Sequence, residues 1–340
     1  MKTISTIALI ALIIWLTSCG TNSSHNDQTD KPSPIDTSYL VKINGVDQYL
    51  EIKGHNKQNP VLLFIHGGPA WPMTPFSRSY NKNLYEDFVV VNWDQRNCGK
   101  SQVDSLVPLN IDLYVSDAYL VTQELKKTFN TDKIFLVCHS WGTAMGVRLI
   151  SKYPSDYYAY VGVGQVVDMK KGCKNLWDFV ETNAKAHNDT AVLNALKKIP
   201  FTAENGFANG RDGLWSLMPL TSKYAFVGGD TSIPFPATAY KDYNFDKLVK
   251  DADRVEKVLE SYTLNMNLES FTDFKIPIYF FVGKYDNICP LKLVEQYSES
   301  IKAPSKEVVL FDLSAHSPIY DEPDKFKTQI KLITDKYYKK

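Results

Sequence analysis

The sequence predicts an α/β fold in which helices cover both faces of a mostly parallel sheet. Short runs of apolar and β-branched residues recur along the chain, and the segments between them place apolar residues at helical spacing. Strands that are apolar throughout are typical of sheets buried on both faces, and their alternation with helices is typical of parallel sheets. The predicted strands are 61–65, 88–92, 134–137, 160–163, 278–282 and 308–311.

An antiparallel hairpin is predicted ahead of the parallel strands. Residues 39–41 and 47–52 form strand-like runs on either side of Asn44-Gly45, and an Asn-Gly pair between two such runs is the usual signal of a tight turn. A long helix is predicted over 111–129, where apolar residues recur at helical spacing and a lysine-rich end suits the negative pole of the helix. A second helix is predicted from Ser140 to about Tyr153.

The strand pattern stops between Val166 and Lys275. This interval offers helical stretches at 176–186, 191–198 and 245–265, and it is too long for a plain connection between two sheet strands. We therefore expect a helical cap over the carboxyl ends of the strands, which is where open α/β sheets bind ligands. The predicted organisation is a core made of residues 38–165 and 276–340, interrupted by a cap over 166–275.

The first residues are typical of a secretion signal. Lys2 is followed by an apolar run over 4–16, which is shorter than the roughly 20 residues that a membrane-spanning helix needs. The sequence Leu-Thr-Ser-Cys at 16–19 resembles the lipobox of bacterial lipoproteins, whose cysteine receives a diacylglycerol and becomes the new N-terminus. This resemblance implies a signal peptide over 1–18 and a lipid on Cys19. An ordinary signal peptide with an incidental cysteine is the alternative.

The segment after Cys19 is predicted to be a flexible tether over 19–37. It is polar, contains two prolines and shows no apolar periodicity. Acyl chains on Cys19 would hold the folded domain at a membrane surface, since each buried methylene contributes about 0.8 kcal/mol. We therefore expect a lipid-anchored protein of the bacterial cell envelope. Gly20 is not the aspartate that some bacteria use to retain lipoproteins in the inner membrane, which favours the outer membrane.

Composition excludes several other classes of function. The chain of 340 residues has 38 basic and 38 acidic side chains, so it has no overall field that would attract nucleic acid, and we expect no nucleic-acid partner. Its five cysteines lack the paired spacing of zinc sites. We expect no metal and no organic cofactor, and we expect free thiols at Cys98, Cys138, Cys173 and Cys289.

The sequence Cys-His-Ser-Trp-Gly at 138–142 lies between a predicted strand and a predicted helix. It resembles the nucleophile elbow Gly-x-Ser-x-Gly of α/β-hydrolases, in which a sharp turn exposes the serine hydroxyl above the sheet. Ser140 is therefore the candidate nucleophile. Cys138 replaces the first glycine of the motif, a departure that a small side chain makes tolerable.

An acid and a base follow in the order that this fold uses. Asp286 comes just after one strand, and His316 comes just after the last strand. His316 would take the proton of Ser140 and return it to the leaving group, while Asp286 would orient the imidazole and stabilise its charged form. The oxyanion would be held by the backbone amides of Trp141 and Gly68.

Three other polar residues have structural interpretations. His66 and His139 lie next to the glycine loop and the elbow, where packing and backbone orientation are more expected than base catalysis. Arg96 is expected to form a structural ion pair.

Several of these motifs together resemble the proline iminopeptidases. They are His-Gly-Gly-Pro at 66–69, Trp-Asp-Gln-Arg at 93–96, Ser-Trp-Gly at 140–142, Asp286 and His316. The resemblance covers most of the mature chain apart from the cap, and it implies an α/β-hydrolase that removes an N-terminal residue, commonly proline, from short peptides. The sequence departs from the family at Ala70 and Asn97, where glycine is usual.

In that family, cap glutamates are thought to hold the substrate ammonium. Among the carboxylates that this cap offers are Asp178, Glu181 and Glu204, and the sequence does not choose between them. An esterase, lactonase or amidase acting on another small acyl substrate through the same triad is one alternative. A lipid-anchored binding protein without turnover is a second. Epoxide hydrolases and dehalogenases are set aside because they place an aspartate where Ser140 stands.

Overall fold

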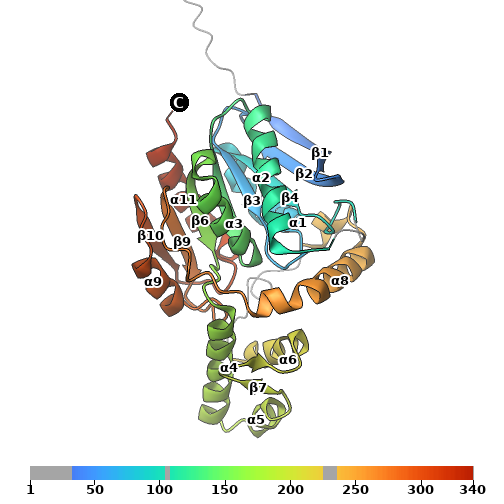
Figure 1. Ribbon diagram of the computed structural model, residues 1–340, viewed down its shortest axis with the longest axis vertical. Helices are drawn as coiled ribbons and strands as arrows, with labels where there is room; N and C mark the ends of the chain where they lie inside the picture. The colour runs from blue at the N-terminus through green and yellow to red at the C-terminus, as the bar shows by residue number, and fades with distance from the viewer. Residues whose placement is uncertain (1–32, 104–107, 225–235, 340) are drawn as a thin grey trace, which may run out of the picture. The chain divides into compact units, whose positions relative to one another are not determined.

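The computed structural model describes residues 33–103, 108–224 and 236–339, and it contains the predicted sheet (Figure 1). Eight strands run in the order β1-β2-β4-β3-β5-β6-β9-β10. The first two strands pair antiparallel with their neighbours, and the other six pair parallel with one another. The strands are β1 (Ile35–Ile43), β2 (Val46–Gly54), β3 (Val61–Ile65), β4 (Val89–Asp94), β5 (Ile134–His139), β6 (Tyr157–Val163), β9 (Ile278–Gly283) and β10 (Lys306–Phe311).

The β1–β2 hairpin turns where the sequence predicts it. Ile43 pairs with Val46, and both turn residues have positive φ, 45° at Asn44 and 85° at Gly45. Two positive φ values in a two-residue loop match the right-handed twist of the flanking strands. Strand β1 begins at Ile35, three residues before the start at residue 38 that the sequence indicates.

Helices cover the two faces of the sheet, and the six parallel strands contribute side chains to a core on each face. In β3, Leu63 and Ile65 join the core under α2, α3 and α9, whereas Leu62 and Phe64 join the core under α1, α10 and α11. This alternation follows from the two-residue period of a strand. The helices are α1 (Thr74–Tyr80), α2 (Ile111–Thr128), α3 (Trp141–Lys152), α9 (Leu291–Ser300), α10 (Pro318–Asp321) and α11 (Pro323–Tyr337), with 3₁₀ turns η1 (Lys82–Glu86) and η2 (Pro154–Asp156).

The cap elements lie between β6 and β9. Helices α4, α5 and α6 lie beyond one end of the sheet, and α8 runs across that end (Figure 1). The three predicted cap helices are present. Helix α6 was not predicted because it contains Pro219. A hairpin of two short strands was not predicted either, because strands of two residues leave no hydrophobic pattern in a sequence. The elements are α4 (Met169–Ala186), α5 (Thr190–Leu196), β7 (Phe201–Thr202), β8 (Gly206–Phe207), α6 (Arg211–Thr221), η3 (Ala237–Tyr240) and α8 (Phe245–Leu264).

The two ends of the cap meet beside the core. The backbone amide of Leu268 donates to the carbonyl of Val167 at 2.7 Å, which joins the exit of the cap to its entry. Helix α4 is held to the loop after β9, since the side-chain amide of Asn175 donates to the carbonyl of Asn287 at 2.9 Å. The cap is thereby tied to the loop that carries Asp286.

The predicted signal peptide, Cys19 and most of the tether lie outside the described residues. Within the described ranges, no helix is both long enough and apolar enough to cross a membrane. The four cysteines in those ranges are buried and free, as the sequence analysis expected.

Candidate active site

Ser140 lies at a sharp turn between β5 and α3. Its backbone has φ 49° and ψ −119°, a conformation that is strained for any residue with a side chain. Main-chain hydrogen bonds hold it: the amide of Ser140 donates to the carbonyl of Val163 at 3.0 Å, and the amide of Thr143 donates to the carbonyl of Ser140 at 2.8 Å. The segment therefore has the strand, turn and helix context that a nucleophile elbow requires.

The missing first glycine of the elbow is compensated on the facing helix. Cys138 is fully buried, and a β-carbon built on Gly146 of α3 would lie 2.5 Å from the Cys138 sulfur and 2.6 Å from the ring of Tyr160. Cys138 and Tyr160 therefore occupy the space that a side chain at position 146 would need. Strand β5 and helix α3 pack closely because Gly146 leaves room on the helix for the Cys138 side chain.

His316 and Asp286 come together from two neighbouring strand ends. The Nδ1 of His316 lies 2.8 Å from the Oδ2 of Asp286, whose side chain is only 1% exposed. The other carboxylate oxygen accepts from the backbone amides of Ile288 at 3.0 Å and Cys289 at 2.8 Å. Burial alone would raise the pKa of Asp286, but His316 and these two amides hold that pKa below its usual range. Asp286 is therefore a stable anionic partner for the imidazole.

The loop after β3 turns sharply through two residues with positive φ. Gly68 has φ 116°, and Ala70 has φ 61° although it carries a side chain. His66 supports this loop from below. It is fully buried, its Nδ1–H donates to the carbonyl of Gly67 at 2.7 Å, and its Nε2 accepts from the amide of Gln95 at 3.2 Å. Burial lowers the pKa of His66 to about 4, so this imidazole is neutral at physiological pH.

Gln95 connects the β3 loop to the elbow. Its side-chain amide donates to the carbonyl of His66 at 2.9 Å, and its side-chain oxygen accepts from the indole of Trp141 at 3.2 Å. The two segments that carry Gly68 and Trp141 are thus braced by one buried side chain. The sequence analysis assigned no role to Gln95, because this role depends on contacts with residues far away in the chain.

The neighbours of Gln95 are structural. Arg96 and Asp117 form a fully buried ion pair, as the sequence analysis expected for Arg96. Asp94 accepts hydrogen bonds from the hydroxyls of Thr74 at 2.7 Å and Tyr243 at 2.9 Å. The buried contacts of residues 94–96 therefore fix the backbone of this segment next to the β3 loop and the elbow.

His139 also acts on the backbone. Its Nε2–H donates to the carbonyl of His316 at 3.0 Å, and the two rings lie 5.1 Å apart. Burial, assisted by the neighbouring His316, lowers the pKa of His139 to about 3. A neutral His139 orients the chain at His316 and is not a second base.

The cap covers a cavity with two lobes around Ser140. The larger lobe has a volume of 540 Å³, and the smaller lobe has a volume of 200 Å³. Gly68, Ser140, Arg211, Trp215, Met218, Glu256 and His316 line both lobes. Ser140, His316 and the glycine loop therefore share one partly open cavity at the carboxyl ends of the strands, which is where this fold places its ligands.

The cap carboxylates that reach this cavity come from α8. Asp253 and Glu256 line the larger lobe, and Glu256 and Glu260 line the smaller one. Arg211, at the start of α6, pairs with Asp253 and with Glu256, both at 2.7 Å, and its backbone amide donates to Glu260 at 3.0 Å. Asp253 also pairs with Lys257 at 2.8 Å, so three carboxylates face two cations and this part of the cavity keeps an excess of negative charge.

The carboxylates named in the sequence analysis lie elsewhere. Asp178 is exposed on α4 and pairs with Lys174, and Glu181 is half-buried on the same helix and pairs with Lys185. Glu204 is exposed. None of the three lines either lobe.

A signal for the α8 carboxylates was present in the sequence. Positions 256 and 260 come three and seven residues after position 253, so the three side chains share one face of the helix predicted over 245–265. An acidic stripe on a cap helix is the pattern that would have selected them.

One group of potential metal ligands occurs among the residues that the structure describes. Suitable atoms of Asp286, Cys289 and His316 lie within 4.8 Å of one another. Asp286 and His316 are already hydrogen bonded to each other, and burial raises the pKa of the Cys289 thiol well above its usual value. A protonated thiol is a poor ligand, so the set does not form a prepared metal site.

The profile of the α/β-hydrolase fold family matches residues 60–323. The chain belongs to this family. Together with the relatives below, this match supports a hydrolase.

Several curated relatives cover most of the chain, and two of them illustrate the likeness. The first is "Probable aminopeptidase YbaC" of Bacillus subtilis (strain 168), which is 28% identical over 300 residues, 84% of this chain and 92% of that protein. The second is "Proline iminopeptidase" of Heyndrickxia coagulans, which is 24% identical over 276 residues, 78% of this chain and 87% of that protein.

Among solved structures, the crystal structure of VinJ superposes with a TM-score of 0.65. It covers 91% of this chain and 100% of the other, at 16% sequence identity. At that identity the likeness shows the fold alone.

Proposed function

We propose that this protein is a serine aminopeptidase that releases an N-terminal residue, proline foremost, from short peptides. Ser140 would attack the first carbonyl carbon while His316 takes the hydroxyl proton, and Asp286 would stabilise the resulting imidazolium. The amides of Gly68 and Trp141 would hold the oxyanion. His316 would then protonate the departing amine, and water would hydrolyse the acyl-enzyme on Ser140.

The observation that carries this proposal is the set of α8 carboxylates above Ser140. An aminopeptidase must hold the ammonium of its substrate one residue from the scissile bond, and Glu256 and Glu260 line the same small lobe as Ser140. Burial raises the pKa of Glu256, which reflects the cost of its charge in the empty site. A substrate ammonium would offset that cost.

The size and lining of the smaller lobe agree with a short apolar residue. Its 200 Å³ are bounded by Met169, Leu214, Leu264 and Ile288, so it would hold a proline ring without polar groups left unpaired. The names of the two curated relatives, an aminopeptidase and a proline iminopeptidase, support the same substrate class.

The deciding measurement is kcat/KM for prolyl-, alanyl- and N-acetylprolyl-anilides beside a short-chain p-nitrophenyl ester. A charge-assisted contact to the ammonium contributes about 1.5–3 kcal/mol, so acetylation should reduce kcat/KM about tenfold to a hundredfold. Glu256→Gln should weaken the free-amine substrates and spare the acetylated one. Glu181→Gln, at a glutamate of the same cap that lines neither lobe, is the matched control and should change neither.

The second candidate is an esterase, lactonase or amidase with the same triad. The pairing of Arg211 with Asp253 and Glu256 favours it, because a neutralised pair attracts an ammonium less strongly. Good turnover of the ester with no turnover of any free-amine anilide would select this candidate. Failure of both substrate classes would favour a binding protein without turnover.

We also propose a lipid on Cys19 that anchors the protein in the bacterial cell envelope. The proposal rests on the apolar run over 4–16 and the Leu-Thr-Ser-Cys sequence that ends at Cys19. The full-length protein should partition into detergent, and Cys19→Ala should remain in the aqueous phase. An unmodified mature terminus at another residue, seen by mass spectrometry, would refute it.

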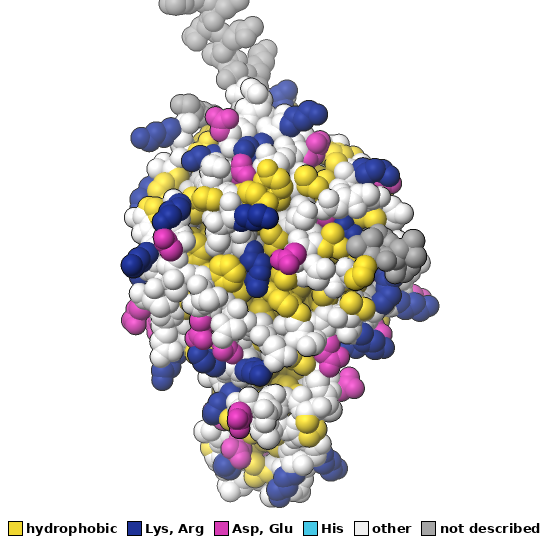
Figure 2. Space-filling view, in the orientation of Figure 1, with side chains coloured by type: hydrophobic (Ala, Val, Ile, Leu, Met, Phe, Trp, Pro, Cys, Tyr) yellow, Lys and Arg dark blue, Asp and Glu magenta, His cyan; other side chains and the backbone are white. Residues whose placement is uncertain are grey.

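The surface gives no sign of a different electrostatic partner on the face that Figure 2 shows. Basic and acidic side chains are interspersed there, so neither sign forms an extended field.

A further inference from the structure

We propose that the larger lobe is a subsite for the leaving group, and that it selects peptides whose second residue has a large apolar side chain, aromatic above all. The inference rests on the proposed function for its substrate class. It concerns a different part of the substrate, because the N-terminal residue and its ammonium occupy the smaller lobe.

The difference in size assigns the two lobes. An exopeptidase needs a closed space for the terminal residue and a roomier one for the rest of the peptide, and the lobes have volumes of 200 and 540 Å³. The chemistry gives the same assignment. His316 must protonate the departing amine, and Ser317 and Tyr320, which follow it in the chain, line only the larger lobe.

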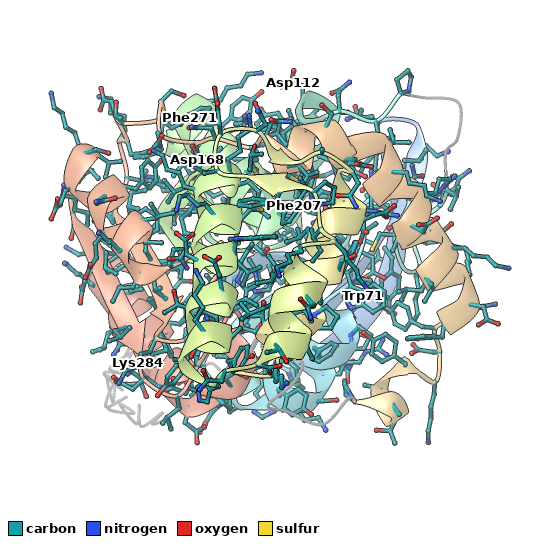
Figure 3. The ribbon with its side chains drawn as sticks, turned by 90° about the horizontal axis from the view of Figure 1, so that it is seen from below. Trp71, Asp112, Asp168, Phe207, Phe271 and Lys284 are labelled. Carbon is teal, nitrogen blue, oxygen red and sulfur yellow. The ribbon has the colours of Figure 1, made fainter. Side chains whose placement is uncertain are left out.

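Aromatic side chains form the walls of the larger lobe. Phe76 and Tyr320 are each 5% exposed, and their ring centroids lie 5.2 Å apart. Trp71 packs edge-on against Phe245, the first residue of α8, with 6.3 Å between the ring centroids. Figure 3 shows Trp71 on the α8 side of the cap. Because these rings are fixed by one another, they offer an apolar ligand a preformed surface and little ordering cost.

Helix α8 completes the lobe with small apolar side chains. Val249 and Ala252 line it, and Val249 is 44% exposed. Asp253 and Glu256 also line this lobe, and each pairs with Arg211 at 2.7 Å. Asp253 pairs with Lys257 as well, at 2.8 Å. An apolar side chain of the second residue would therefore cover Val249 and the aromatic wall without leaving a free charge facing it.

The test compares prolyl dipeptide amides that differ only in the second residue. Amides avoid a terminal carboxylate near the carboxylates of α8. Burying an aromatic side chain against this wall should raise kcat/KM for prolyl-phenylalaninamide about tenfold to a hundredfold above that for prolyl-serinamide. Prolyl-leucinamide should lie between them.

A matched pair of variants locates the effect. Val249→Ser removes apolar surface from the lobe and should reduce the ratio of the phenylalanine to the serine substrate about threefold to tenfold. Val258→Ser, also an exposed valine on α8 but outside both lobes, should leave that ratio and the basal activity unchanged. Met169→Ala, in the smaller lobe only, should change the preference for the first residue and not for the second.

Ethyl and benzyl esters of one acyl group test the lobe without an amide bond. Each rate is divided by the rate of hydroxide hydrolysis, and the benzyl ester should again be favoured about tenfold, with the same response to Val249→Ser. Equal rates across second residues and across alcohols would overturn the inference while leaving aminopeptidase activity intact. A Val249→Ser effect on the first residue alone would reverse the assignment of the lobes. Turnover of esters with no turnover of prolyl amides would remove the proposed function, and the ester comparison would still decide the subsite.

Discussion

Ser140 shows how the fold holds a single residue in a strained conformation that suits the proposed role of nucleophile. A side chain at positive φ costs of order 1–3 kcal/mol, and the fold sustains it because β6 and α3 provide hydrogen bonds on both sides of the turn. These bonds are made by the main chain and do not involve the hydroxyl. The serine hydroxyl can therefore be removed without changing the elbow.

Replacing Ser140 by alanine separates chemistry from folding. We expect Ser140→Ala to lower turnover by about 10⁴- to 10⁶-fold, because the acyl-enzyme can no longer form. The midpoint of urea unfolding should stay close to that of the wild type, since the elbow hydrogen bonds remain. Turnover near the wild-type value would show that another residue is the nucleophile.

Ala70 and Asn97 stand where glycine is usual in the family that the sequence resembles, so they can be used to measure the energetic cost of a side chain at positive φ. Both residues have positive φ, 61° and 59°, so the conformation is kept although the glycine is absent. This conformation costs about 1–2 kcal/mol for alanine and less for asparagine. Glycine relieves this strain, but it also gives the unfolded chain more conformational entropy, which offsets part of the gain. Ala70→Gly should therefore raise the free energy of unfolding by about 0.5–1 kcal/mol. Asn97→Gly should change it by less, and a larger gain at Asn97 would contradict this reasoning.

The residues that sequence motifs reveal differ in kind from those that the structure adds. Ser140, Asp286 and His316 each follow a recognisable strand, so their placement could be predicted from local pattern and order. Gln95 belongs to a recognisable motif and Glu256 to an acidic stripe on a predicted helix. Neither pattern indicates the role of its residue, because the roles depend on Trp141 and Ser140, far away in the chain.

At the scale of elements, the packing of α3 on β5 depends on one pair of positions. Gly146 faces Cys138 and Tyr160 at distances that exclude a side chain. We expect Gly146→Ala to lower the free energy of unfolding by about 1–3 kcal/mol, since overpacking forces neighbouring atoms to shift. Cys138→Gly should recover part of that loss, because it frees the space that the sulfur occupies. A double-mutant cycle with no coupling between the two positions would refute this account.

The cap shows where element prediction fails. Helices α4, α5 and α8 have continuous helical spacing and begin after a capping Asp or Asn, so they were recognisable. Helix α6 begins after Gly210 and carries Pro219, both of which read as breaks in a sequence. Because α6 supplies Arg211 and Trp215 to the cavity, the missed element is also the one that shapes the site.

At the scale of the whole described domain, an ionic network joins the segment before α8 to the core. Asp242 pairs with Arg78 and Lys100, and Arg78 also pairs with Glu51 of β2. Tyr243, the next residue, reaches the buried carboxylate of Asp94. The core, whose strands are long and apolar, could be predicted from periodicity, whereas this network could not, since it joins residues from four separate segments.

Buried ionisable groups beside the site make stability depend on pH in opposite directions. Burial raises the pKa of Asp94 to about 6, so its protonated form stabilises the fold below about pH 4, and that contribution is lost as the pH rises through 6. Burial lowers the pKa of His66 to about 4, so the stability linked to its neutral form is present above about 6.5 and is lost as the pH falls towards 4.

The variant Asp94→Asn isolates the Asp94 contribution. In the wild type, proton binding by Asp94 offsets part of the acid destabilisation caused by buried His66. Without the titrating carboxyl, the free energy of unfolding should rise more steeply between pH 4 and 6, by up to about 1.4 kcal/mol per pH unit. The stability of the variant relative to the wild type should therefore rise over the same interval, because burial penalises only the ionised carboxyl. Urea unfolding at half-unit pH steps measures both effects, with Asp273→Asn, an exposed carboxylate, as the control. Parallel curves for wild type and Asp94→Asn would show that Asp94 ionises normally in the folded protein.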